Sequence, residues 1–260
     1  MNYWQAVVLG LVQGLTEFLP VSSSGHLVLA EALIGVKMPG LFVEVALHVA
    51  TLGSVLIVYG RRLWEIIRGV FTGSAQGVRH AALLAVATIP AAVIGILFQK
   101  PIEEHFHSML ALGIEFIVTG LLLWSTRGAS GDRTLPGWAG AVSIGLGQAF
   151  AILPAISRSG ATVAAALWAR LSPAAAAEFS FLMAIPVIAG AALLEARHAA
   201  VNLSQVGQGP FVVSFLVSFV SGIFAIRFLV AMLRRGRFYA FAPYCWIVGI
   251  LTIVYALGRG

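Results

Sequence analysis

Most of the chain consists of apolar runs long enough to cross a lipid bilayer, and this feature excludes ordinary soluble folds. A helix needs about 20 apolar residues to span the hydrocarbon core. Six uninterrupted runs of this kind occur, at residues 42–60, 81–98, 108–126, 174–195, 211–232 and 239–257. Because 60% of the 260 residues are hydrophobic and only 10% are charged, the sequence predicts an all-α integral membrane protein with a single domain over residues 1–260.

Two further apolar stretches, residues 3–35 and 137–170, are each interrupted by a polar loop. The interruptions read "LPVSSSG" and "LPAISRSG". Inside a membrane, broken helices are tolerated only where the freed backbone groups are buried in protein or line a cavity. We therefore expect six transmembrane helices plus two re-entrant helix-loop-helix hairpins, with the loops shielded from lipid.

The two interrupted stretches also resemble each other. Adding 135 to a residue number in the first aligns Gly10, Leu11, Gln13, Ser22, Ser24, Gly25 and Val28 with Gly145, Leu146, Gln148, Ser157, Ser159, Gly160 and Val163. This correspondence predicts an internal repeat whose halves cover about residues 1–130 and 136–260.

The net charge of +6 comes from short arginine clusters between apolar runs, which orient a membrane protein and contact anionic lipid rather than nucleic acid. If both hairpins return to their side of entry, ten basic residues lie on the cytoplasmic side and four outside. The ten are Arg61, Arg62, Arg68, Arg79, Arg127, Arg133, Arg170, Arg234, Arg235 and Arg237, and the four are Lys37, Lys100, Arg197 and Arg259. The bias predicts inverted-topology repeats, with residues 61–80 forming a cytoplasmic loop or short surface helix.

The first hairpin carries several groups suited to chemistry. Glu17 follows Gln13 by one helical turn, and an ionisable group inside a membrane is functional by default. Gln13 either contributes to the site or joins helices by a hydrogen bond. In "SSSGH", backbone N–H groups at a helix start, together with Ser22, Ser24 and Gly25, favour anion binding. These serines are equally suited to helix capping.

His26 is expected to exchange a proton with a nearby serine hydroxyl or a leaving oxygen. The second loop supplies Arg158, whose guanidinium matches phosphate oxygens. Together the two loops offer groups for phosphoryl transfer. His48 and Thr51 are expected to support this site, and Glu115 either lines the cavity or pairs between helices.

The motifs "QGLTEFLPVSSSGH" and "LPAISRSGAT" resemble the two signatures of the undecaprenyl-diphosphate phosphatase family, also called bacitracin-resistance proteins. The resemblance extends to "ALHVATLGSVL", "ATIPAAVIGILF" and "FSFLMAIPVIAG" and covers nearly the whole chain. It departs from the family at Ala155, where glycine is usual, and at Gln13, where glutamate is frequent.

The resemblance implies an enzyme that hydrolyses undecaprenyl diphosphate to undecaprenyl phosphate plus inorganic phosphate. The implied location is the outer face of the bacterial cytoplasmic membrane, where this reaction recycles the lipid carrier for cell-wall synthesis and confers bacitracin resistance. It implies Mg²⁺ or Ca²⁺ as cofactor, with Glu17 and Gln13 as the metal-associated element.

By motif position the resemblance assigns Ser23 as nucleophile, His26 as its proton partner and Arg158 as phosphate clamp. Phosphate binding is assigned to Ser22, Ser24, Gly25, Ser157, Ser159, Gly160 and Thr162. The expected partners are a long-chain isoprenoid diphosphate and membrane lipids, without nucleic acid, and a homodimer is left open.

The sequence also has features of two other classes of membrane protein. A lipid transporter or flippase would use the same inverted repeats but needs no nucleophile beside a proton acceptor. A lipid phosphatase of the acid-phosphatase type would carry histidine six residues after its Ser-Arg pair, and Ala164 occupies that position. The sequence leaves open a phosphoserine intermediate versus an activated water, the metal, and the preferred lipid chain length.

Overall fold

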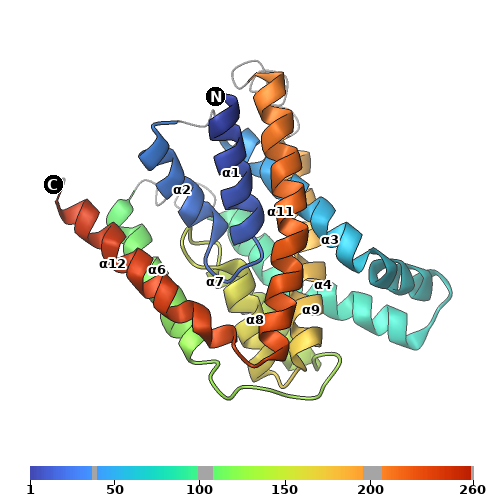
Figure 1. Cartoon of the computed structure of the whole chain (residues 1–260). Helices are drawn as coiled ribbons and strands as arrows, with labels where there is room; N and C mark the ends of the chain where they lie inside the picture. The colour runs from blue at the N-terminus through green and yellow to red at the C-terminus, as the bar shows by residue number, and fades with distance from the viewer. Residues whose placement is uncertain (37–39, 99–107, 196–206, 259–260) are drawn as a thin grey trace.

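The computed structural model describes residues 1–36, 40–98, 108–195 and 207–258. Within these ranges the chain is helical and forms no β-sheet, and only an isolated bridge joins Arg133 and Leu171. The predicted all-α class is therefore confirmed for the described part of the chain, whose helices form one bundle (Figure 1). The four basic residues predicted to face outside, Lys37, Lys100, Arg197 and Arg259, lie outside the described residues.

The described residues form the following helices, in chain order. They are α1 (Tyr3–Thr16), α2 (Ser23–Ile34), α3 (Gly40–Phe71), α4 (Ala75–Leu97), α6 (Met109–Trp124), α7 (Trp138–Phe150), α8 (Arg158–Trp168), α9 (Pro173–Glu195), α11 (Gln208–Arg234), the 3₁₀ helix η2 (Phe238–Phe241) and α12 (Ala242–Leu257).

Among the described residues, five segments are long and apolar enough to cross a membrane. They are Phe42–Phe71, Ala75–Leu97, Pro173–Leu193, Gln208–Arg234 and Phe238–Leu257. The run predicted at 108–126 forms α6, which has 16 residues and is about 24 Å long at a rise of 1.5 Å per residue. This length is below the roughly 30 Å of the hydrocarbon core, so the sixth crossing stays a prediction.

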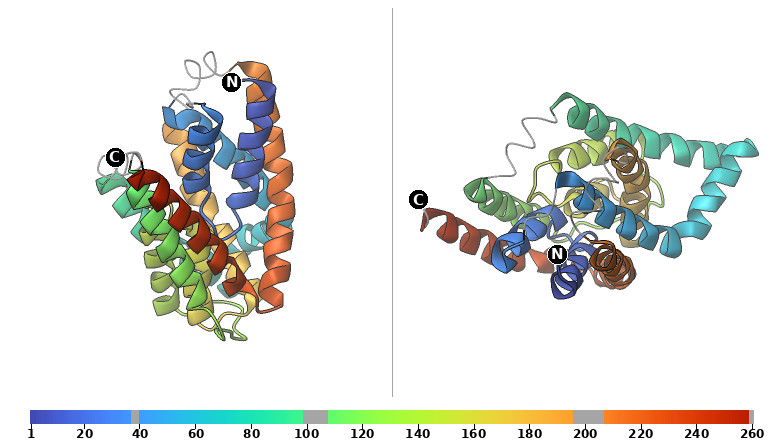
Figure 2. Two further views of the ribbon diagram at one scale, coloured as in Figure 1. Left: turned by 60° about the vertical axis from the view of Figure 1, so that its left-hand side comes forward. Right: turned by 90° about the horizontal axis from the view of Figure 1, so that it is seen from above.

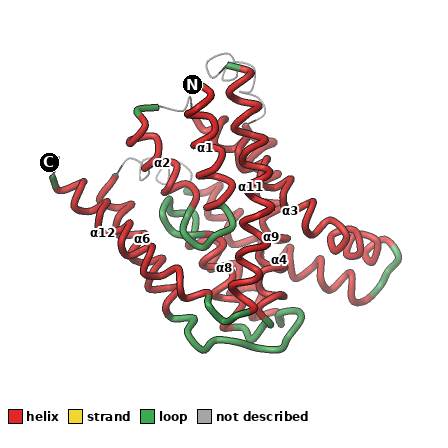
Figure 3. The backbone as a smooth tube through the Cα atoms, in the orientation of Figure 1, coloured by secondary structure: helices red, strands yellow, loops and turns green. Residues whose placement is uncertain are grey.

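The two interrupted stretches each form a pair of short helices joined by a loop. Helices α1 and α2 run in opposite directions, as do α7 and α8 (Figures 1 and 2). Figure 3 shows the two connecting loops inside the bundle, between its ends. The fold therefore brings together the two polar interruptions of the sequence.

The second helix of each pair begins with the same capping interaction. Ser22 caps α2 by accepting a hydrogen bond from the backbone N–H of Gly25 at 3.3 Å, and Ser157 caps α8 by accepting one from Gly160 at 3.0 Å. A serine at this position satisfies one of the free N–H groups at a helix start. The residues that the repeat aligns, Ser22 with Ser157 and Gly25 with Gly160, thus form the same capping interaction in both halves.

Helix α3 continues well beyond the predicted span at residues 42–60, so residues 61–71 extend that helix where a cytoplasmic loop or a short surface helix was expected. The helix ends at Phe71, and Gly73 makes the turn into α4 with a φ of 68°. Ion pairs of Glu65 with Arg61 and Arg62, each at 3.3 Å, lie along the helix and support it. Seen along the bundle, the far ends of α3 and α4 project to one side (Figure 2, right).

Small residues let α1 and α11 pack closely. A Cβ on Gly10 would contact Val217 at 3.0 Å. A Cβ on Gly14 would lie 3.0 Å from the Cα of Ser218 and closer still to the carbonyl oxygen of Ser218 and the hydroxyl of Ser221. Helix α7 approaches α4 in the same way, because a Cβ on Gly145 would lie 2.5 Å from the carbonyl oxygen of Ala87. Each loop-bearing pair is therefore held by a glycine contact to a long helix.

Replacing Gly14 with Val is expected to destabilise the protein by about 1–3 kcal/mol, since the new side chain would push α1 away from α11. The matched control is Gly60→Val in α3, where an added Cβ meets open space. Thermal unfolding in detergent would measure both variants. Equal midpoints for the two would show that close packing at Gly14 is not needed.

Candidate active site

The two loops contact each other directly. Ser22 Oγ donates a hydrogen bond to the backbone oxygen of Pro154 at 2.6 Å, and Ser159 Oγ donates one to the backbone oxygen of Leu19 at 3.2 Å. Because each loop is bonded to the other, their side chains have fixed relative positions.

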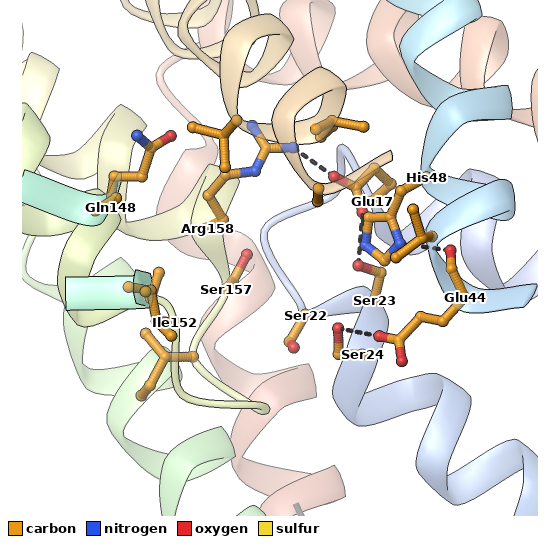
Figure 4. A pocket seen from close by; sticks show the side chains of 18 of the residues that line it. Glu17, Ser22, Ser23, Ser24, Glu44, His48, Gln148, Ile152, Ser157 and Arg158 are labelled. Atoms are coloured by element: carbon orange, nitrogen blue, oxygen red, sulfur yellow. Dashed lines mark hydrogen bonds and ion pairs between the residues drawn. The ribbon is translucent and has the colours of Figure 1, made fainter. Parts of the chain in front are cut away.

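Glu17 is the centre of the site. It is 5% exposed, and its Oε1 accepts a hydrogen bond from Nη2 of Arg158. Its Oε2 accepts hydrogen bonds from Ser23 Oγ at 2.7 Å and Gln13 Nε2 at 3.0 Å. The Nε2 of His48 lies 3.2 Å from the same oxygen (Figure 4). The structure thus brings Gln13, Glu17, Ser23 and Arg158 together as the sequence predicted.

His26 lies elsewhere, which corrects its predicted pairing with Ser23. Its Nδ1 is 2.7 Å from the backbone oxygen of Ser22, and its Nε2 is 2.8 Å from the hydroxyl of Tyr244. The imidazole also stacks on the Tyr244 ring. Both ring nitrogens therefore have partners other than Ser23, whose hydroxyl bonds to Glu17 instead.

A cavity of about 330 Å³ borders the two loops. Its polar lining comprises Thr16, Glu17, Ser22, Ser23, Ser24, Glu44, His48, Gln148, Ser157 and Arg158, and its apolar lining includes Val45, Ala91, Ile152, Val187 and Ile188. A concave site with an apolar wall and a few convergent polar groups is the usual form of a small-molecule or lipid-headgroup pocket.

Only some of the predicted phosphate-binding residues face this cavity. Ser22, Ser24 and Ser157 line it. The N–H groups of Gly25 and Gly160 are instead bonded to the capping serines. The glycines serve close packing: a Cβ on Gly25 would lie 2.7 Å from the Phe116 ring.

The remaining two predicted phosphate-binding residues bond within the protein. Ser159 Oγ reaches the first loop through Leu19, and Thr162 Oγ1 lies 2.6 Å from the hydroxyl of Ser180 in α9. Both side chains are buried. We assign Ser159 and Thr162 to holding the second loop in place.

Glu115 also positions the second loop. Its Oε2 accepts a hydrogen bond from the backbone N–H of Ala155 at 2.8 Å, and the Ala155 carbonyl accepts one from Thr119 at 2.8 Å. Ala155 is not among the described residues with positive φ. The alanine that replaces the family's usual glycine therefore fits this backbone without strain.

Sequence reasoning missed Glu44 and gave Gln148 no functional role. Glu44 Oε1 accepts a hydrogen bond from Ser24 Oγ at 2.8 Å, and the backbone oxygen of Glu44 lies 2.8 Å from Nδ1 of His48. The spacing of Glu44 and His48, four residues apart in an apolar run, was the available signal.

The family resemblance implies a divalent cation, with Glu17 and Gln13 as its protein ligands. No group of three or more His, Cys, Asp or Glu side chains among them could hold a metal ion. The predicted pair offers one buried oxygen without a partner, Oε1 of Gln13, while both oxygens of Glu17 are bonded to protein donors. Since Mg²⁺ and Ca²⁺ take six or more oxygen ligands, most ligands would have to come from elsewhere.

The chain matches known proteins over almost its whole length. The family model described as bacitracin resistance protein BacA matches residues 6–251. The undecaprenyl-diphosphatase of Carboxydothermus hydrogenoformans is 42% identical to it, with 98% of this chain and 97% of the relative covered. The undecaprenyl-diphosphatase of Desulfosudis oleivorans is 44% identical, with 96% and 97% covered.

These matches include both hairpins and the helices that carry Glu44, His48 and Gln148. They are therefore not confined to apolar segments that any membrane protein would share. The chain belongs to the bacitracin resistance protein BacA family.

Proposed function

We propose that this protein hydrolyses undecaprenyl diphosphate to undecaprenyl phosphate and inorganic phosphate. The observation that carries the proposal is the joining of Ser23, Glu17 and Arg158 at one cavity. A nucleophile bonded to a base, next to a guanidinium, is the arrangement that phosphoryl transfer requires. All of these residues come from one chain, so a homodimer is not needed to complete the site.

In the proposed reaction Ser23 Oγ attacks the terminal phosphorus and its proton passes to Glu17 Oε2. A bond forms between Oγ and phosphorus while the anhydride bond breaks, and undecaprenyl phosphate leaves with the bonding electron pair. Water then attacks the phosphorus of the phosphoserine, and the bond between phosphorus and Oγ breaks. The proton held by Glu17 returns to Oγ, so that inorganic phosphate is released and both side chains are restored. In the alternative, Ser23 orients a water that attacks directly, and Glu17 accepts the proton of that water.

Two further side chains support Glu17 in this role. The Nε2 of His48 lies 3.2 Å from Oε2, and Gln13 donates to the same oxygen. These contacts hold the carboxylate oxygen toward Ser23. Precise placement of a general base raises the rate of the chemical step, because even a small shift in its position lowers that rate strongly.

Arg158 is proposed to stabilise the negative charge of the diphosphate. Its Nη1 is buried without a protein partner, whereas its Nη2 bonds to Glu17. A phosphate oxygen in the cavity would accept from the free nitrogen. The guanidinium thus links the base to the substrate.

We propose that Glu44 and Gln13 Oε1 would contribute to holding a divalent cation, Mg²⁺ or Ca²⁺, at the cavity. When bound, it would neutralise part of the phosphate charge. Glu44 lines the cavity, and only one of its two carboxylate oxygens accepts the hydrogen bond from Ser24. Its other oxygen and Gln13 Oε1 are protein oxygens that would be free to bind such an ion.

The proposed topology consists of inverted repeats with two re-entrant hairpins in the bacterial inner membrane. Equivalent helix contacts support it: α1 packs against α11, as α7 packs against α4. The cavity is bordered by Gly95 and Ala191, near the ends of α4 and α9 that lead to the predicted outer loops. These positions support an active site that opens to the outer face.

Cysteine labelling would test this topology in a Cys245→Ala background, because Cys245 is the one cysteine of the sequence. A cysteine at Leu33, at the end of α2, is expected to react from outside, and one at Gly73, in the α3–α4 turn, only from the cytoplasm. An N-terminal tag should be accessible from the same side as Leu33. Access to the tag and Leu33 from opposite sides would show that α1 and α2 together cross the membrane.

The activity itself is tested with purified protein and undecaprenyl diphosphate in detergent. We expect phosphate release that a chelator reduces and added Mg²⁺ or Ca²⁺ restores. A flippase would move labelled lipid across vesicles without releasing phosphate. Binding of the lipid without phosphate release would contradict the proposal.

A further inference from the structure

Gln148 is buried at the cavity with neither polar atom of its side chain bonded to protein. It is 2% exposed, and both Nε2 and Oε1 lack a hydrogen-bond partner. A buried amide without partners is costly in a folded protein. Gln148 lines the cavity, so a molecule bound there is a candidate partner for its amide.

The comparison with Gln13 shows why this amide is free. In the first hairpin Gln13 donates to Glu17, one turn later, at 3.0 Å. In the second hairpin the residue one turn after Gln148 is Ile152, which offers no acceptor. The two halves thus use equivalent glutamines differently, one to hold the base and one to face the cavity.

Gln148 also has a defined place relative to the reacting groups. Figure 4 shows Gln148 on one side of Arg158, with Glu17 and Ser23 on the other. In phosphoryl transfer the attacking and leaving oxygens lie roughly in line on opposite sides of the phosphorus. If the terminal phosphate lies beside Ser23 and Arg158, the leaving phosphate lies toward Gln148.

We propose that Gln148 and Nη1 of Arg158 form a binding site for the phosphate that stays on the lipid. The Gln148 Nε2 donates to an oxygen of this second phosphate. The Arg158 Nη1, buried and without a protein partner, donates to the oxygen that bridges the two phosphates and that stays on the lipid phosphate after the bond breaks. The site therefore favours a lipid-linked diphosphate over inorganic phosphate. The inference rests on the proposed function, because it takes the reaction to be attack by Ser23 or its water on the terminal phosphate.

The test compares three ligands in Ser23→Ala protein, which cannot turn over by the proposed route. Gln148→Leu, of similar size, is expected to weaken binding of undecaprenyl diphosphate and of undecaprenyl phosphate by about 10- to 100-fold, since each loses a hydrogen bond to a charged group. Inorganic phosphate, which lacks the lipid-linked group, should bind unchanged at the terminal position. Gln148→Glu, nearly identical in shape, should weaken the two lipids further through like-charge repulsion.

A second measurement separates binding from a structural role. Gln148→Leu removes two buried polar atoms without partners, so the ligand-free variant should unfold at the same temperature as the parent or higher. A lower unfolding temperature, unchanged lipid binding, or equal weakening of inorganic phosphate would each overturn the assignment. Because binding is measured without turnover, these outcomes are independent of whether wild-type protein releases phosphate, which alone decides the proposed function.

Discussion

Ser23→Ala and Glu17→Gln are each expected to lower phosphate release from undecaprenyl diphosphate by about a thousandfold or more. The hydroxyl and the carboxylate are 2.7 Å apart and act as one unit, since the serine needs the base to lose its proton. The double variant should therefore be scarcely worse than either single one. Initial rates of phosphate release for the three variants measure this coupling.

The control for this cycle is Ser54→Ala. Ser54 is also buried and its hydroxyl donates to the backbone oxygen of Phe219 at 2.6 Å, but it does not line the cavity. This variant should lose some stability and retain activity. Multiplicative losses in the Glu17/Ser23 cycle would show independent roles, and full activity of Ser23→Ala would leave an activated water as the attacking group.

Arg158→Lys is expected to lower kcat/KM by at least about thirtyfold, equivalent to roughly 2 kcal/mol of transition-state stabilisation. Lysine keeps the positive charge but is a point donor, so it cannot bond to Glu17 and to the substrate through two fixed nitrogens. Steady-state kinetics with undecaprenyl diphosphate would measure the loss.

Arg62→Lys is the matched control for the guanidinium. Arg62 donates to Glu178 at 2.9 Å and lies in the C-terminal half of α3, away from the cavity. The same exchange there should leave kcat/KM unchanged. Near-normal activity of Arg158→Lys would mean that Arg158 contributes charge alone and that its two-nitrogen geometry is not used.

The sequence by itself determined the membrane class, the positions of the two polar loops and which residues those loops carry. Runs of about 20 apolar residues have few possible structures in lipid, because backbone groups must be paired within the segment. The same constraint made the polar interruptions informative and predicted Glu17 and Arg158 as functional residues, whereas Ser23 was assigned by the family resemblance.

Only the tertiary structure decided which side chains meet. His26 is three residues from Ser23, yet its ring is held by Tyr244, 218 positions away, and Glu17 bonds to Ser23 instead. Local spacing shows which groups share a loop, but the direction of each side chain depends on helices that pack from distant parts of the chain. The roles of Glu44 and Gln148 follow from the same packing, since a residue becomes part of a cavity only when other helices form its remaining walls.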